Sequence, residues 1–301
     1  MNMREGQNAS RLLIVDGHAY AYRAFYAIRQ LNSPEGLGTN AIYGFIKMLA
    51  KMQARVKPSH VAVVWDGGLD AQRMTLHPEY KAQRPSSPPD LDRQIGEIQE
   101  YLEHAGFPTC QRDGIEADDV IACLCQEALR EGFEVVIASS DKDFMPLVSE
   151  RVGILNPNDK SETIWGAAEV KAKTGVEPKH VLEWLSLIGD SVDNIPGVPG
   201  VGPQTAANLL NQFGSIDEIY ARLDEVKSER MRNLLRESET IVRKNLNLIR
   251  LNDCVDGGLD LKGCLLRDAD ERRLIELYRR WGFKTMLHEM EARQEAQPAL
   301  L

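Results

Sequence analysis

Three apolar runs lie in the first half of the chain, and each leads into an acidic residue. They are Leu12-Leu13-Ile14-Val15-Asp16, Val61-Ala62-Val63-Val64-Trp65-Asp66 and Val135-Val136-Ile137-Ala138-Ser139-Ser140-Asp141-Lys142-Asp143. Runs of this length and composition predict strands buried on both faces, as in a parallel sheet covered by helices. In such sheets the ligand site lies beyond the carboxyl ends of the strands. We therefore expect these acidic strand ends to meet in one crevice.

The segments between the runs have the spacing of helices, and a further strand is predicted over 152–155. The predicted helices cover residues 19–28, 39–56 and 91–105, a segment opening at 116–119, and residues 178–188 and 203–213. Residues 69–90 are polar, basic and rich in proline, so we expect a surface excursion that is not part of the core. The predicted fold is α/β, with a mostly parallel central sheet flanked by helices and a helical C-terminal part.

Composition limits the class of protein. The chain is 43% hydrophobic and 27% charged, as in ordinary globular proteins, and no apolar stretch approaches the roughly 20 residues that span a bilayer. Residues 1–10 lack the apolar region of a secretion signal, which favours a cytoplasmic location. The five cysteines show no C-x-x-C pairing and predict no zinc site.

Nine carboxylates are candidate ligands for divalent metal ions. Besides the strand ends, clusters occur at 116–119 and 190–193, and the full set is Asp16, Asp66, Glu116, Asp118, Asp119, Asp141, Asp143, Asp190 and Asp193. Mg²⁺ or Mn²⁺ prefers oxygen ligands, and two such ions can activate water and stabilise a phosphoryl transition state. Each Asp alone could instead cap a helix or balance its dipole. The repetition at three strand ends favours a metal site.

The net charge of −9 would by itself argue against a nucleic-acid partner. The nine acids assigned to a metal cluster account for this whole charge. The remainder of the chain is then close to neutral, and local basic patches decide what it binds. Residues 221–250 carry such a bias, with eight Lys or Arg against five Asp or Glu.

A glycine-rich segment over 195–210 joins two predicted helices. Its glycines follow the pattern G-x-x-G-x-G at Gly197, Gly200 and Gly202, and Pro203 suits the first turn of the next helix. No predicted strand precedes it, so it is not a dinucleotide-binding motif. Two interpretations remain: a plain connection between helices, or a hairpin that holds a DNA backbone without reading its sequence.

Taken together, these motifs resemble the 5′-nuclease domain of bacterial DNA polymerase I and its stand-alone and phage relatives in the flap-endonuclease superfamily. The resemblance runs from about residue 11 to about residue 290, with six motifs in the same order. They are Val15-Asp16-Gly17 with Tyr22-Arg23-Ala24-Phe25, Trp65-Asp66-Gly67, Pro78-Glu79-Tyr80-Lys81-Ala82-Gln83-Arg84, Glu116-Ala117-Asp118-Asp119, Asp141-Lys142-Asp143, and Gly189-Asp190 through Asp193-Asn194-Ile195-Pro196-Gly197-Val198 with the hairpin. All nine carboxylates of the family pattern are present.

The resemblance implies a role for each candidate residue. Asp16, Asp66 and Asp118 would hold one Mg²⁺ or Mn²⁺ ion with help from Glu116 and Asp119, and Asp141, Asp143, Asp190 and Asp193 would hold or shape a second. Residues 69–105 would include the family's helical arch, from which Lys81 and Arg84 reach the scissile phosphate. Arg73 and Arg23 would add basic contacts to DNA, and Tyr22 or Tyr80 would stack on an unpaired base. Gly197, Gly200 and Gly202 would lie in a helix–three-turn–helix motif that holds duplex DNA and can bind K⁺ on its carbonyls over 195–203. A solvated basic loop is the alternative for Lys81 and Arg84.

The resemblance also implies the activity: hydrolysis of phosphodiesters near junctions of a 5′ single strand and duplex, in primer removal and DNA repair. The implied substrate is DNA with a 5′ flap, nick or free 5′ end, with an RNA primer tolerated, and a DNA polymerase is an implied protein partner. The protein is expected to be a monomer in the bacterial cytoplasm, with no membrane partner. A PIN-type RNase and a non-catalytic binder of DNA junctions are the alternatives. We expect a nuclease core over 11–176, a helical DNA-binding subdomain over 177–290, and flexible ends at 1–10 and 291–301. No polymerase sequence follows residue 301, which indicates a free-standing nuclease or a piece of a longer polymerase.

Overall fold

The computed structural model describes residues 10–159, 161 and 163–296. Its centre is a six-stranded sheet with the order β3-β2-β1-β4-β5-β6. The strands are β1 (Arg11–Asp16), β2 (His60–Trp65), β3 (Thr109–Gln111), β4 (Glu134–Ala138), β5 (Val152–Leu155) and β6 (Ile164–Trp165). All neighbours pair in parallel except β5 and β6, which pair antiparallel. The mostly parallel sheet and the strands expected from the apolar runs are confirmed.

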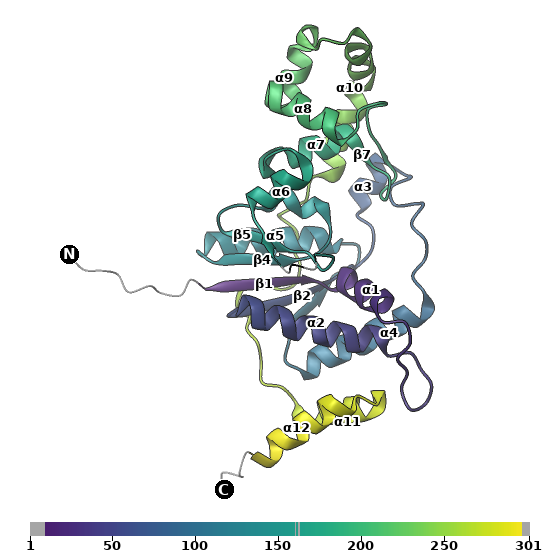
Figure 1. The fold of residues 1–301 in the computed structure, drawn as a ribbon, viewed down its shortest axis with the longest axis vertical. Helices are drawn as coiled ribbons and strands as arrows, with labels where there is room; N and C mark the ends of the chain where they lie inside the picture. Colours follow the sequence, from purple (N-terminus) through teal and green to yellow (C-terminus); the bar gives the residue numbers. More distant parts are fainter. Residues whose placement is uncertain (1–9, 160, 162, 297–301) are drawn as a thin grey trace, which may run out of the picture.

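Both faces of the sheet are covered because its strands are apolar on both sides. In β1, Leu12 and Ile14 belong to one hydrophobic core, and Leu13 and Val15 belong to the other. All four side chains are fully buried. Helices α1 (Gly17–Ala27), α2 (Asn40–Val56) and α4 (Pro89–His104) contribute to one core, and α5 (Ala117–Arg130) and α7 (Val181–Ile188) contribute to the other (Figure 1).

The strand order reverses at β1. The chain runs from β1 outward to β2 and β3 on one side, and β4 and β5 are added on the other side. In sheets of this kind the crevice for ligands lies beyond the carboxyl ends of the strands at the reversal point. Here that point lies between β1 and β4, next to β2, so the three acidic strand ends are brought together.

The short strands β3 and β6 were not predicted from the sequence. They contain three and two residues, respectively, and both lie at the edges of the sheet. A strand of that length contains too few residues for a recognisable alternation of polar and apolar positions.

The remaining elements are mostly helical. A two-stranded hairpin of β7 (Gly189–Asp190) and β8 (Ile195–Pro196) follows α7. The other elements are α3 (Ala71–Leu76), η1 (Lys142–Leu147), α6 (Ala167–Thr174), η2 (Pro178–His180), α8 (Pro203–Phe213), α9 (Ile216–Ala221), η3 (Leu223–Glu225), α10 (Glu229–Ile249), η4 (Lys262–Cys264), α11 (Glu271–Trp281) and α12 (Lys284–Ala296). No helix in the described part of the chain is long and apolar enough to cross a membrane.

The last two helices differ from the sequence-based expectation of one helical subdomain over 177–290. Helices α8, α9 and α10 form one end of the molecule, and α11 and α12 lie at the opposite end (Figure 1). Leu277, Tyr278 and Trp281 of α11 are buried in the same core as α2 and α4. The expected flexible ends fall largely on residues outside those described, except that residues 291–296 continue helix α12.

Residues 69–90, the basic excursion after β2, were expected to lie on the surface, but part of this segment is buried. Its first part forms α3, and Arg73, Tyr80 and Lys81 are only 7%, 4% and 7% exposed. Helix α4 was expected as part of the arch, but its Leu91 and Ile98 are buried in the core, so the arch would end at about residue 88. Figure 1 shows the chain between α3 and α4 as a long connection along one side of the ribbon.

Candidate active site

Three carboxylates stand at the carboxyl ends of neighbouring strands, as the apolar runs predicted. Asp16 ends β1, caps α1, and accepts a hydrogen bond from the backbone N–H of Ala19 at 3.0 Å. Asp66 directly follows β2 and accepts from the N–H of Gly68 at 2.8 Å. Asp141 follows β4, caps η1, and accepts from the N–H of Asp143 at 2.9 Å. The capping role and a ligand role are therefore compatible, because each carboxylate has a second oxygen.

Ser139 fixes the distance between two of these strand ends. It is fully buried, its hydroxyl donates to Oδ2 of Asp16 at 2.7 Å, and its oxygen accepts from the N–H of Asp141 at 3.1 Å. The only signal for it in the sequence is a small polar residue immediately after β4, which many strands have. Ser139 is a supporting residue of the site that sequence reasoning missed.

A second group of carboxylates lies close to the first. One oxygen each of Asp143, Asp190 and Asp193 lies within 4.8 Å of the others. Asp143 comes from η1, and Asp190 and Asp193 come from the β7–β8 hairpin. Oδ1 of Asp143 is buried and has no hydrogen-bond partner among the described residues. A buried carboxylate oxygen without a donor is costly, and a bound cation would satisfy it.

The protonation equilibria of these groups show how strongly they repel one another. Burial, together with repulsion from Asp141 and Asp66, raises the pKa of Asp16 to about 6. Burial, then repulsion from Asp141 and Asp16, raises the pKa of Asp118 well above its ordinary value. Burial and the charges of Asp141, Asp190 and Asp193 do the same to the pKa of Asp143. The carboxylates of both groups thus form one electrostatic cluster that favours bound cations.

The donor set fits hard divalent ions. The cluster offers carboxylate oxygens and no cysteine or histidine ligand, which suits Mg²⁺ or Mn²⁺. The residues that could hold ions are Asp16, Asp66, Asp118, Asp141, Asp143, Asp190 and Asp193.

Glu116 and Asp119, the remaining two of the nine carboxylates, are already neutralised by the chain itself. Both oxygens of Asp119 accept from Arg73, at 2.7 and 2.8 Å. Oε2 of Glu116 accepts from Lys81 at 2.7 Å and from the hydroxyl of Tyr80 at 3.1 Å. Both carboxylates are 1% exposed. These contacts do not favour direct coordination of a metal ion by Glu116 and Asp119, and their expected help to the first ion stays a prediction.

The same contacts correct two sequence-based expectations for the excursion. Arg73 was expected to contact DNA, but it is buried against Asp119 and Glu116. Tyr80 was expected as a stacking platform, but its ring is buried and its hydroxyl is bonded to Glu116. Opposite charges paired inside the protein attract more strongly than in water, so a polar segment can be buried when its partners are in place.

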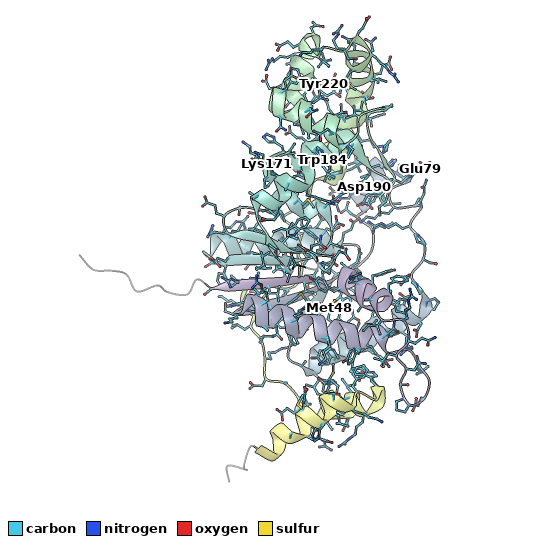
Figure 2. All side chains as sticks on the ribbon, viewed as in Figure 1. Met48, Glu79, Lys171, Trp184, Asp190 and Tyr220 are labelled. Atoms are coloured by element: carbon cyan, nitrogen blue, oxygen red, sulfur yellow. The ribbon has the colours of Figure 1, made fainter. Side chains whose placement is uncertain are left out.

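Lys81 and Arg84 do lie at the carboxylate cluster. Lys81 adopts a left-handed backbone conformation, with φ 56°, and its N–H donates to the carbonyl of Asp193 at 3.0 Å. Arg84 is partly exposed and forms an ion pair with Asp193. The side-chain N–H of Asn194 donates to the carbonyl of Glu79 at 2.9 Å. Figure 2 shows Glu79 on the segment that faces Asp190. The excursion is therefore fastened to the hairpin that supplies Asp190 and Asp193.

Tyr22 and Arg23 lie on α1, directly after Asp16. Tyr22 is partly buried and Arg23 is exposed. Arg23 lines a cavity with Met48 and Asn156, which are not members of the carboxylate cluster, so contact of Tyr22 and Arg23 with DNA stays a prediction. Lys142, which sequence reasoning did not select, lies 3.1 Å from Asp190 and adds a cation to the carboxylate cluster.

The three glycines of the hairpin differ in what their backbone requires. A Cβ on Gly197 would lie 2.2 Å from the carbonyl group of Ile188, so close packing within the protein requires that glycine. Gly200 has φ +77°, and Gly202 precedes α8 with open space around it. Packing therefore explains Gly197, and only Gly200 and Gly202 keep the features expected of a surface that another molecule approaches closely.

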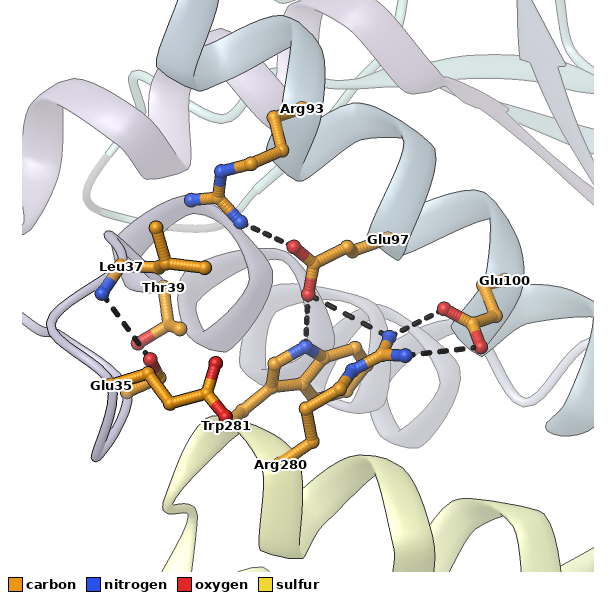
Figure 3. Close-up of a pocket in the computed structure, with 9 residues that line it drawn as sticks. Glu35, Leu37, Thr39, Arg93, Glu97, Glu100, Arg280 and Trp281 are labelled. Atoms are coloured by element: carbon orange, nitrogen blue, oxygen red, sulfur yellow. Dashed lines mark hydrogen bonds and ion pairs between the residues drawn. The ribbon is translucent and has the colours of Figure 1, made fainter.

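A separate cavity of about 240 Å³ lies away from the carboxylates, between the 33–39 loop, α4 and α11 (Figure 3). Four of its charged side chains are paired: Arg93 with Glu97 within α4, and Arg280 of α11 with Glu100 of α4. The indole N–H of Trp281 donates to Glu97. The contacts of Arg280 and Trp281 connect α11 to α4, which makes the cavity part of a structural contact.

Comparison with known proteins agrees with this geometry. Residues 11–175 match the family described as "5'-3' exonuclease, N-terminal resolvase-like domain", and residues 176–272 match "5'-3' exonuclease, C-terminal SAM fold". The chain is 36% identical over 291 residues to a 5'-3' exonuclease of Aquifex aeolicus, covering 96% of this chain and 99% of that protein. It is 35% identical over 286 residues to DNA polymerase I of Bacillus caldotenax, covering 94% of this chain but 32% of the polymerase.

Solved structures share the fold. The T5 5'-exonuclease with bound zinc superimposes with a TM-score of 0.68 at 23% identity, covering 80% of this chain and 90% of that chain. The catalytic core of Rad2 in complex with DNA superimposes with a TM-score of 0.62 at 19% identity, covering 90% of this chain and 87% of that chain. The family matches and the identity to the exonuclease settle the relationship: this chain belongs to the 5'-3' exonuclease family, which includes the nuclease region of bacterial DNA polymerase I.

Proposed function

We propose that the chain is a structure-specific 5′ nuclease that hydrolyses DNA phosphodiesters near junctions of a 5′ single strand and duplex, using two divalent metal ions. The observation that carries the proposal is the group of Asp143, Asp190 and Asp193, in which the buried Oδ1 of Asp143 has no hydrogen-bond donor among the described residues, beside the strand-end carboxylates. The Aquifex exonuclease, similar over nearly its whole length, and the metal-bound T5 exonuclease support it.

The proposed division of the carboxylates into two sets is the one that the family resemblance implies. Asp16, Asp66 and Asp118 would hold one ion, and Asp141, Asp143, Asp190 and Asp193 would hold or shape the other. Mg²⁺ is the expected ion, with Mn²⁺ as a substitute, because the donors are all carboxylates. When bound, the ions supply an activated water and neutralise the charge that develops on the phosphate. Glu116 and Asp119 belong to neither set. They would act by holding the first turn of α5, which carries Asp118, in position.

Lys81 and Arg84 would bind the scissile phosphate. Each is paired with a carboxylate of the site, Glu116 for Lys81 and Asp193 for Arg84. A phosphate entering the crevice would share or displace these contacts. Lys81 supplies a point charge and Arg84 a planar fork of donors, and both oppose the negative charge of the transition state.

The DNA would be held on both sides of the site. Gly200, Gly202 and the free N–H groups at the start of α8 would meet the phosphates of the duplex, and carbonyls over 195–203 could hold a K⁺ ion. Tyr22 and Arg23 would contact the single strand at α1. We propose that this work takes place on bacterial DNA, in primer removal and repair, with a 5′ flap, nick or free 5′ end as substrate and an RNA primer tolerated; the bacterial origin of the relatives supports this proposal. We propose a monomer that can work with a DNA polymerase.

A labelled 5′-flap substrate tests the proposal directly. We expect cleavage near the junction in Mg²⁺ and none in excess chelator. Asp66→Asn and Asp141→Asn should abolish cleavage while flap binding stays intact or becomes tighter, because each change removes a ligand charge and its repulsion toward DNA. Asp256→Asn, on an exposed loop outside the cluster, is the matched control. Undiminished cleavage in chelator, or equal activity of all three variants, would refute the proposal.

A further inference from the structure

The side chain of Arg73 has more polar contacts than its place in a basic excursion suggests. Its Nε donates to the carbonyl of Leu248 at 3.1 Å, and Nη2 donates to the carbonyl of Arg250 at 3.1 Å. Nη1 and Nη2 donate to the two oxygens of Asp119, and Nη1 lies 3.3 Å from Oε2 of Glu116. A guanidinium has five N–H groups, and here five oxygens surround it.

These contacts join three segments that are far apart in the sequence. Arg73 belongs to α3, Glu116 and Asp119 bound the first turn of α5, and Leu248 and Arg250 lie at the carboxyl end of α10. Asp119 strengthens the junction, because one of its oxygens also accepts from the N–H of Asn252 at 2.8 Å. The junction therefore connects the helical end of the molecule to the carboxylate cluster.

The physical reason for an arginine is clear from its partners. The last carbonyls of a helix have no partner within the helix and carry the negative end of its dipole. The two carboxylates add full negative charges in a buried place. Only a planar cation with several fixed donors can meet all of these oxygens at once, and a lysine ammonium cannot. Although burial opposes the charged form, the bonds to Asp119 keep the pKa of Arg73 above its ordinary value.

We propose that Arg73 is a positioning residue, which fixes the first turn of α5, and hence the Asp118 carboxylate, relative to the end of α10. Asp118 lies between Glu116 and Asp119, and Arg73 holds both. Movement of that turn would move Asp118 within the cluster. The inference rests on the proposed nuclease function, and it replaces the expected contact of Arg73 with DNA, because each of its three side-chain nitrogens already donates to a protein oxygen.

The test compares Arg73→Lys with wild type in four measurements. They are the single-turnover cleavage rate at saturating flap, its Mg²⁺ dependence, Mn²⁺ affinity by calorimetry without DNA, and flap affinity by anisotropy in chelator. Loss of an outer contact to a metal site typically costs 10–100-fold in affinity or activity. We expect losses of roughly this size in rate and in Mn²⁺ affinity, with flap affinity changed by less than about twofold.

Two further variants keep the inference testable if Arg73→Lys fails to fold. Asp119→Asn removes the main partner with little change in shape, and Arg73→Gln with Asp119→Asn removes both charges together. If the pair acts as one unit, the double variant should lose no more rate than the worse single variant. Arg272→Lys on the exposed face of α11 is the matched control, since its side chain is 90% exposed.

Two results would overturn the inference. One is a folded Arg73→Lys or Asp119→Asn protein with the wild-type rate and Mn²⁺ affinity. The other is a loss of flap affinity in chelator with an unchanged rate at saturation, which would make Arg73 a DNA contact. If wild type itself cleaves no flap, the proposed function fails, but the Mn²⁺ affinities still decide the role of Arg73.

Discussion

Replacing Asp16 with asparagine should stabilise the metal-free protein. Burial is the main cause that raises the pKa of Asp16 from 3.8 to about 6, and the charges of Asp141 and Asp66 add to it. The folded protein therefore keeps a proton on Asp16 at pH values where the unfolded chain has lost it. The free energy of unfolding must then fall as the pH rises from about 4 to about 6.

The size of the effect follows from the two pKa values. Each pKa unit is worth about 1.4 kcal/mol, so the ionised Asp16 carboxylate costs the folded protein ~3 kcal/mol above pH 6. A neutral asparagine side chain would carry no such cost, and its amide oxygen can still cap α1 by accepting from the N–H of Ala19. The amide NH2 that replaces Oδ2 cannot accept from the Ser139 hydroxyl, so that bond is lost in its present form. Allowing for this loss, we expect a gain of roughly 1–3 kcal/mol at pH 8. At about 2–4 °C per kcal/mol, the melting temperature should rise by several degrees.

Thermal unfolding in chelator at pH 4 and pH 8 measures the stability difference between Asp16→Asn and wild type. The advantage of Asp16→Asn should be full at pH 8 and should shrink toward zero at pH 4. In Mg²⁺ the advantage of the variant should largely disappear, because wild type gains about 2.7 kcal/mol when the ion concentration is 100 times its dissociation constant, which is as large as the expected advantage. Asp270→Asn, which changes the cap of α11 outside the cluster, controls for the substitution itself. An offset that does not depend on pH, or a less stable variant at pH 8 in chelator, would refute the reasoning.

Three other variants test separate parts of the site. Lys81→Ala should lower the single-turnover rate by roughly 10²–10³ while flap affinity falls only modestly, because many phosphate contacts remain; an unchanged rate at saturation would make Lys81 a tether. Ser139→Ala should raise the Mg²⁺ concentration needed for half-maximal rate by roughly 10–100-fold, since Asp16 loses its hydroxyl donor; an unchanged Mg²⁺ titration would contradict this. Gly200→Val should weaken duplex binding equally for unrelated sequences, because φ +77° costs a β-branched residue roughly 1–3 kcal/mol. Gly132→Val, which has a similar φ of +84° and open space but lies outside the hairpin, is its control in anisotropy measurements, and a change in base preference without loss of affinity would contradict backbone recognition.

The sequence was sufficient to predict four of the six strands of the sheet and the meeting of the three acidic strand ends. Long apolar runs predict buried parallel strands, and the topology of such sheets brings Asp16, Asp66 and Asp141 to one edge. Local patterns also placed α2 and α8 correctly to within one residue at either end. These features depend on spacing along a short stretch of chain, which a single sequence displays.

The environment of the basic excursion could not be predicted in the same way. Arg73 is bonded to Asp119, 46 residues away, and to Leu248, 175 residues away. A run of polar residues has the same pattern whether it is solvated or paired inside the protein, so Arg73 and Tyr80 were assigned to the surface. The packing of α11 against the nuclease core was not predicted, because an apolar helix face in the sequence does not indicate which surface of the protein it packs against.

The pairing of buried charges explains how one small region can contain nine carboxylates. Within the described residues, four cations of the chain contact this set: Arg73, Lys81, Arg84 and Lys142. They compensate fewer than half of the nine negative charges, and two of them serve Glu116 and Asp119, the pair whose role is structural. Two divalent ions, as proposed, would bring four more positive charges and leave the region nearly neutral. A region without Arg73 and Lys81 would remain clearly negative after both ions had bound, and it would repel the phosphate of the substrate. Arg73 and Lys81 thus make a site with this many carboxylates compatible with an anionic substrate.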